Sequence, residues 1–166
     1  MTIAAVFIGL VLALSAGADY DDDRDLFLYI KAKAEAGDIQ AQSALGEAYW
    51  FGQGTQQNDR LARIWWEKSA KRGDADAQYN LGALYQNKND TTAKFWFEKA
   101  AKQGNADAQN NLGVILSQEG DNETAGHWFR KAIRNGSEEA RQNLIDIGQS
   151  PHRRSRKRKM YKWKYQ

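Results

Sequence analysis

The stretch AQYNLGALY, from Ala77 to Tyr85, decides the fold because the chain contains it in four versions. The other three are AQSALGEAY from Ala41, AQNNLGVIL from Ala108 and the more divergent ARQNLIDIG from Ala140. Their shared leucines are separated by 36, 31 and 32 residues (Leu45, Leu81, Leu112 and Leu144). A repeat of this length is typical of stacked helical hairpins, each of which buries its apolar face only against its neighbours.

A second helix is predicted after each of the first three versions, with the sequences ARIWWEKSAKRG, AKFWFEKAAKQG and AGHWFRKAIRNG. Each ends in glycine, the common residue at a helix C-terminus. Asn58 or Asp59 is the expected N-cap of the first of these helices. The prediction is an all-α solenoid of about eight helices, packed as successive antiparallel pairs over residues 19–149. We divide it into a half-repeat at 21–37, full repeats at 38–73, 74–104 and 105–136, and a capping helix at 137–148.

Positions that stay the same between copies indicate how the helices pack. A glycine inside a helix costs about 1 kcal/mol relative to alanine, yet one recurs in three copies, as Gly46, Gly82 and Gly113. We therefore expect the helices to approach too closely there for a Cβ atom. The large core groups are expected to be aromatic pairs on the second helix of each repeat. These pairs are Trp65–Trp66, Trp96–Phe97 and Trp128–Phe129.

Composition excludes several classes of function. The 166 residues include no Cys, so disulfides, thiol catalysis and thiolate metal sites are excluded. The formal net charge of +3 is unevenly distributed, because residues 151–166 hold eight Lys or Arg and no acid. The rest of the chain has 16 Lys or Arg against 21 Asp or Glu, a net charge of −5. An acidic body therefore carries a strongly basic segment.

The N-terminus is expected to be an export signal. Residues 3–18 carry no charge and are mostly apolar, and Ala16-Gly17-Ala18 offers the small residues that signal peptidase accepts. The alternative is an uncleaved anchor in the inner membrane, although about 16 apolar residues are short for a span of about 20. We expect residues 1–18 to be removed near Ala18 and the body to be periplasmic or secreted.

These residues resemble the Sel1-like repeat, a relative of the tetratricopeptide repeat. Residues 34–73 follow the family pattern closely, including Gly52-Gln53-Gly54 and Asp59, while the second and third repeats lack the Gly-x-Gly loop. The third repeat also has Leu116 where tyrosine is expected. The resemblance implies a right-handed superhelix of antiparallel helix pairs, export from a bacterium and a role as a protein-binding adaptor. Some family members are immunity proteins against exported antibacterial toxins.

In such solenoids the first helix of each repeat lines the concave face. Positions on it that differ between copies are free of the shared packing constraint and are candidate partner contacts. They form three rows, each with one residue from each copy: Ser43, Tyr79, Asn110 and Gln142; Glu47, Ala83, Val114 and Asp146; and Ala44, Asn80, Asn111 and Asn143. Trp50, which has no aromatic counterpart in the other copies, is a further candidate. Asn side chains offer donors and acceptors to a peptide backbone. An exposed Tyr79 is the expected centre of binding, because Tyr is enriched at such positions.

The basic segment at 150–166 is expected to be disordered alone. Its candidate contact residues are Arg153, Arg154, Arg156, Lys157, Arg158, Lys159, Lys162, Trp163 and Lys164. They suit anionic lipid or lipopolysaccharide, with the aromatics entering the interface. Nucleic acid binding and nuclear import fit poorly with export. The remaining interpretation is a solvated tail, or one that folds back on the acidic body of its own or another copy.

No catalytic constellation is found. The two histidines are His127, expected to be partly buried and structural, and His152 in the basic segment, and no phosphate loop or nucleophile elbow is present. We therefore expect a non-enzymatic adaptor that needs no cofactor, metal or small-molecule substrate and binds another protein. The alternatives are an immunity protein and an envelope polyanion binder acting through the basic segment.

Overall fold

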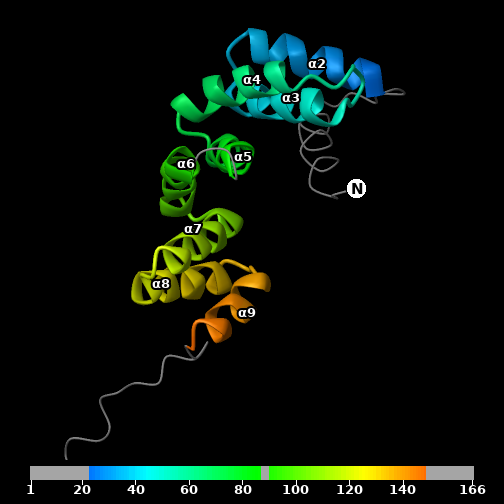
Figure 1. Cartoon of the computed structure of the whole chain (residues 1–166). Coiled ribbons are helices and arrows are strands. Elements are labelled where there is room, and N and C mark those ends of the chain that lie inside the picture. The colour runs from blue at the N-terminus through cyan, green and yellow to red at the C-terminus, as the bar shows by residue number, and fades with distance from the viewer. Residues whose placement is uncertain (1–22, 87–89, 149–166) are drawn as a thin grey trace, which may run out of the picture.

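The computed structural model of the chain describes residues 23–86 and 90–148 (Figure 1). Within these ranges it is all-helical, and the predicted eight helices are confirmed. They are α2 (Asp23–Glu35), α3 (Ile39–Phe51), α4 (Asp59–Lys71), α5 (Ala75–Tyr85), α6 (Asp90–Lys102), α7 (Ala106–Gln118), α8 (Asn122–Arg134) and α9 (Glu139–Asp146). The predicted signal at 1–18 and the basic segment at 150–166 lie outside the described residues.

Consecutive helices pack against one another along the whole stack, from α2 to α9. In addition α3, α5, α7 and α9 each contact the next helix of this set, whereas α2, α4, α6 and α8 do not contact one another. We call the first set the inner helices and the second set the outer helices. Figure 1 shows the stack bending into an arc, with the inner helices on the side to which the arc opens.

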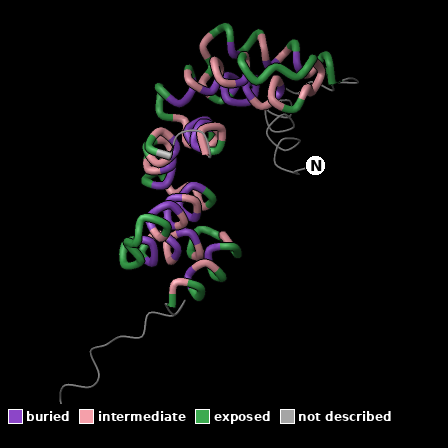
Figure 2. The backbone as a smooth tube through the Cα atoms, viewed as in Figure 1, coloured by how far each residue is buried: buried purple, intermediate pink, exposed green. Residues whose placement is uncertain are grey.

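The core is divided along the stack instead of gathering at one centre. Three clusters of buried residues are formed, one around α2 and α3, one between α4 and α5, and one extending from α6 to α9. Figure 2 shows this as buried segments recurring from one end of the stack to the other. Such a stack is stabilised by contacts between neighbouring repeats.

The three mid-helix glycines lie where the aromatic ring of the following outer helix reaches the inner helix. A Cβ atom built on Gly46, Gly82 or Gly113 would meet the ring of Trp66, Phe97 or Phe129, respectively, at 2.6 Å or less. Real Cβ atoms do not approach that closely, so the prediction of a forbidden Cβ is confirmed. In each of the three full repeats, one ring of the outer helix (α4, α6 or α8) therefore lies directly on one glycine of the inner helix before it.

The aromatic pairs do not enter the core together, which corrects the expectation that both members are core groups. The second members, Trp66, Phe97 and Phe129, are buried, but the first members are only partly buried. Each first member is covered by a lysine ammonium group: Lys68 lies 3.8 Å from the Trp65 ring centroid, and Lys131 lies 4.4 Å from that of Trp128. This cation–π contact lets a large ring remain at the outer surface.

A buried glutamine joins each of the inner helices α3, α5 and α7 to the end of the preceding outer helix. The Nε2 atoms of Gln42, Gln78 and Gln109 donate to the carbonyl oxygens of Ala34, Ala70 and Ala101 at 3.1, 3.0 and 2.9 Å. Carbonyls in the last turn of a helix have no partner within the helix, so these bonds satisfy groups that burial would otherwise leave costly. The repeat pattern alone did not indicate a role for these glutamines.

The helix ends follow the sequence signals. Asn58 is the N-cap of α4 and accepts a hydrogen bond from the Leu61 amide at 3.0 Å, as expected. Gly73 follows α4 with φ of +102°, the conformation that favours glycine at a helix C-terminus. At the end of the stack, Ile145 of α9 occupies the position of the mid-helix glycines and is 49% exposed.

Candidate functional site

The predicted contact positions lie on the inner helices. On α5 the residues Asp76, Tyr79, Asn80 and Ala83 follow the spacing of one helix face. Ala83 and Asp76 are exposed, while Tyr79 and Asn80 are partly buried. Equivalent positions on α3, α7 and α9 continue this surface, which we call the inner face.

Three predicted contact positions are not on the accessible surface. Ser43 and Asn110 are each only 4% exposed, and Ala44 is 5% exposed. Their positions are covered because each inner helix packs against the next, so a variable position can still be a buried one. From the first predicted row, Tyr79 stays partly accessible and Gln142 is exposed. The available inner face is therefore narrower than the sequence indicated.

Two hydrogen bonds between polar side chains link neighbouring inner helices. Asn80 Nδ2 donates to Glu47 Oε1 at 3.2 Å, which links α5 to α3. Asn143 Nδ2 donates to Asn110 Oδ1 at 2.8 Å, which links α9 to α7. The predicted asparagine row is thus partly engaged within the protein, and these bonds fix the orientation of side chains that a ligand would meet.

Tyr79 lies at the middle of the inner face and is more buried than expected. Its ring packs against Phe97 with 5.9 Å between ring centroids. Burial raises the pKa of the Tyr79 hydroxyl, and the carboxylates of Asp107 and Glu139 raise it further, whereas a hydrogen bond with Asn111 acts in the opposite direction. The ring is therefore held in place by the core while its hydroxyl senses acids from two other inner helices.

Glu47 is the most perturbed carboxyl group on this face. Burial raises the pKa of Glu47 to about 7, the hydrogen bond from Asn80 opposes the rise, and the carboxylates of Asp76 and Asp74 add to it. Burial and Asp76 also raise the pKa of Asp74. The sequence placed Glu47 among the contact candidates, but its burial between α3 and α5 depends on packing and could not be predicted from composition.

Charge is separated between the two sets of helices. The inner helices α3, α5 and α7 contain no Lys or Arg, and they carry Glu47, Asp76 and Asp107. All outer helices contain Lys or Arg. The one basic residue in α9, Arg141, pairs with Glu138 at 3.3 Å. The inner face is consequently acidic, and the direction of the Tyr79 and Glu47 shifts agrees with this.

Two further predicted residues have clear positions. Trp50 is partly buried at the C-terminal end of α3, where its ring packs on Trp66 with 5.6 Å between centroids. Val114 is partly buried on α7 and packs against the α6–α9 core cluster. Of the contact candidates, Ala83 and Val114 thus place apolar surface beside the hydrogen-bonded polar side chains.

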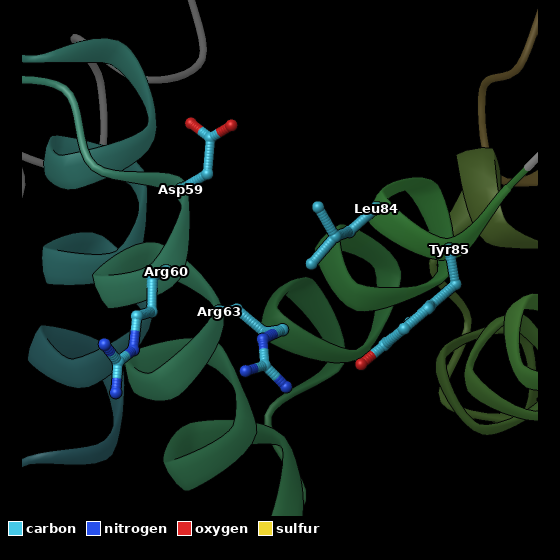
Figure 3. Close-up of a pocket in the computed structure, with 5 residues that line it drawn as sticks. All are labelled: Asp59, Arg60, Arg63, Leu84 and Tyr85. Carbon is cyan, nitrogen blue, oxygen red and sulfur yellow. The ribbon is translucent and has the colours of Figure 1, made fainter. Parts of the chain in front are cut away.

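One pocket was not foreseen. It lies between the start of α4 and the end of α5, has a volume of about 330 Å³, and is lined by Asp59, Arg60, Arg63, Leu84 and Tyr85 (Figure 3). Arg63 pairs with Glu67 at 3.0 Å and forms a hydrogen bond with Tyr85. The available signal was a basic residue at the same repeat position in two copies, Arg63 and Lys94, which becomes Gly126 in the third.

The described residues offer neither a metal site nor a membrane span. No group of three His, Cys, Asp or Glu side chains within 23–86 and 90–148 could hold a metal ion. In the same ranges no helix has the length and apolar character needed to cross a bilayer. His127, expected to be partly buried, is instead exposed and lies edge-on to Trp128 with 6.0 Å between centroids.

Comparison with known proteins agrees with this architecture. The Sel1 repeat matches residues 39–74 and 75–105, and the tetratricopeptide repeat matches residues 106–135. A Sel1 repeat protein from Oxalobacter formigenes has a crystal structure with 34% sequence identity and a TM-score of 0.65, covering 74% of this chain and 98% of that one. The chain belongs to the Sel1 repeat family. Its third repeat, which has Leu116 where the family has tyrosine, is the one that matches the tetratricopeptide pattern.

A second solved relative is larger. It is c5321, a protective antigen present in uropathogenic Escherichia coli strains and displaying an SLR fold, with 30% identity and a TM-score of 0.74. The match covers 86% of this chain but only 33% of that protein, so the chain spans about a third of its length. No curated protein matches the chain. Sel1 repeats are typically scaffolds for protein interaction and are generally not catalytic.

Proposed function

We propose that this Sel1 repeat protein is a non-catalytic adaptor of the bacterial envelope that binds a partner protein on its inner face. The observation that carries the proposal is the partly exposed Tyr79 at the middle of the inner face, flanked by the hydrogen bonds that link α3 to α5 and α7 to α9. Side chains already fixed by neighbours lose little freedom on binding, which favours affinity. An aromatic residue at the centre of a face is the usual anchor of a protein interface.

Location in the envelope rests on the sequence of residues 1–18. A charge-free apolar stretch followed by Ala16-Gly17-Ala18 suits a cleaved export signal, which would release the repeats into the periplasm or the medium. If the stretch is retained, it would instead anchor the repeats at the inner membrane. Either case presents the inner face to other exported proteins.

The test is a pull-down of envelope proteins with three versions of the full-length chain as bait. Ala83 is exposed on α5, so Ala83→Trp adds a large neutral side chain to the inner face without disturbing the core. The matched control is Thr91→Trp, which is also an exposed position but lies on outer helix α6. We expect one protein to be retained by the wild type and by Thr91→Trp, and to be lost with Ala83→Trp. Equal retention by all three baits would place binding elsewhere and refute the proposal.

A second candidate is binding to anionic lipid or lipopolysaccharide through residues 150–166. The eight Lys or Arg residues and the interspersed Tyr161, Trp163 and Tyr165 support it. Vesicles of anionic phospholipid would then retain the chain at low salt and release it as the salt concentration rises, because salt screens the attraction between the basic side chains and the lipid head groups. Ala83→Trp would not weaken this binding.

A further inference from the structure

Three acidic residues of the inner face lie at equivalent positions of successive repeats. Asp76, Asp107 and Glu139 occupy the same position in the first turns of α5, α7 and α9, and all three are exposed. Acids are favoured near helix N-termini in general. That preference does not explain why α3, α5 and α7 lack Lys and Arg altogether. The separation of charge therefore points to an occupant of the inner face and not only to helix stability.

These carboxylates are not neutralised within the described residues. The ion pairs of residues 23–86 and 90–148 join outer-helix acids to nearby bases or join Lys94 to Glu119 and Arg141 to Glu138. None of them includes Asp76, Asp107 or Glu139. Their uncompensated charge is felt across the face, since Asp107 and Glu139 both act to raise the pKa of the Tyr79 hydroxyl.

We propose that the inner face is a docking surface for a basic segment that contains aromatic residues, and that residues 151–166 of the same chain occupy it. This segment has eight Lys or Arg and no acid, which complements a face with acids and few bases. Tyr161, Trp163 and Tyr165 alternate with lysines, so the segment can place rings beside Ala83 and Val114. The inference rests on the proposed function, because both place the binding site on the inner face.

The segment has the length needed to cover the face. It follows α9, the last inner helix, and its 16 residues extend about 50 Å at roughly 3.3 Å per residue. Four helices packed at about 8–10 Å span roughly 30 Å. A tethered segment also acts at an effective concentration near the millimolar range. A partner protein must therefore compete with the segment, and a basic stretch on that partner is the chemistry best suited to do so.

The experiment uses paramagnetic relaxation on the full-length chain. Because the chain has no Cys, Ser155→Cys gives a single attachment point for a nitroxide spin label. At low ionic strength we expect stronger broadening of amide signals in α5 and α7, far along the stack from the attachment point, than in the outer helices α4 and α6. In about 1 M salt, where the screening length is about 3 Å, the broadening should disappear.

A matched pair of variants tests the role of the acids. The inner variant carries Asp76→Asn, Asp107→Asn and Glu139→Gln, and the outer variant carries Glu35→Gln, Glu98→Gln and Glu123→Gln, which removes the same charge. We expect the inner variant to lose the broadening and the outer variant to keep it, with both retaining the helical circular dichroism of the wild type.

Three outcomes would overturn the proposal. The first is an absence of broadening at low salt, and the second is broadening mainly on the outer helices. The third is broadening seen only between differently labelled molecules in a mixed sample, which would mean that a second copy supplies the segment. The proposed function fails separately, because it depends on the loss of the captured protein with Ala83→Trp and not on the position of residues 151–166.

Discussion

The ring of Phe97 lies directly on Gly82, so that a Cβ atom on Gly82 would fall 2.5 Å from a ring carbon. The same relationship joins Trp66 to Gly46 and Phe129 to Gly113. Because each repeat uses one such contact to hold its two helices together, the contact is a direct test of how the stack is stabilised.

Gly82→Ala should destabilise the protein although alanine is the better helix former. Alanine gains up to about 1 kcal/mol in helix propensity, but Phe97 is fully buried and cannot move without displacing the core. Overpacking of this kind costs about 1–3 kcal/mol, so thermal unfolding should occur at a lower temperature. Phe97→Leu should also destabilise the protein, but the double variant should lose less than the sum of the two single losses; additive losses would contradict the assigned contact.

Gln78→Leu should weaken the junction between α4 and α5. Leucine fits a similar volume but cannot donate to the Ala70 carbonyl or accept from Gln103, the two bonds that Gln78 makes at 3.0 and 2.8 Å. The expected loss in the free energy of unfolding is about 1–2 kcal/mol, measured by urea denaturation. Gln118→Leu, at an exposed position on α7, is the control and should change stability little.

The stability of the protein should fall as pH rises through the range set by Glu47. Its pKa is raised from 4.5 to about 7 in the folded protein, so the folded state binds more protons than the unfolded state between these values. The free energy of unfolding therefore decreases from about pH 4.5 to about pH 7, by roughly 3 kcal/mol at most. Asp74, whose pKa is also raised, contributes in the same direction.

Glu47→Gln should flatten this pH dependence. Glutamine keeps an oxygen that can accept the bond from Asn80, and it has no proton to lose. Thermal unfolding of this variant, followed from pH 4.5 to 7.5, should show a clearly smaller change than the wild type. Glu123→Gln, at an exposed site on α8, serves as the control; an unchanged slope in Glu47→Gln would mean that another group causes it.

Tyr79→Ala should reduce partner binding by at least about tenfold, since truncating an aromatic anchor commonly costs 2 kcal/mol or more. Tyr79→Phe keeps the contact with Phe97 and loses only the hydroxyl, so it separates packing from hydrogen bonding. Affinity for the captured protein is measured by titration calorimetry. If Tyr79→Ala binds as well as the wild type, Tyr79 is not the centre of the binding face.

Much of the fold could be predicted because the copies of the repeat can be compared with one another within a single sequence. An identical residue in several copies, such as Gly82, indicates a contact that no copy can change. The inference from a variable position to an exposed side chain was weaker. Ser43 and Asn110 vary between copies and are nevertheless buried, because the space between neighbouring inner helices accepts several small polar side chains.

Neither the pocket beside Arg63 nor the raised pKa of Glu47 could be predicted from the sequence, for a related reason. Both depend on how closely two particular helices approach, and the repeat pattern specifies their order and not their separation. Similarly, the first tryptophan of each pair was expected in the core, because the sequence does not show that a lysine three residues later covers its ring.

Ile145 has a consequence for how such an array can grow. A further outer helix docking on α9 in the manner of its predecessors would need an open glycine backbone to receive its ring, and the branched side chain of Ile145 occupies that place. Duplication of a hairpin could therefore lengthen the array between existing repeats but not beyond α9. Appending repeats in the same geometry would therefore first require Ile145→Gly.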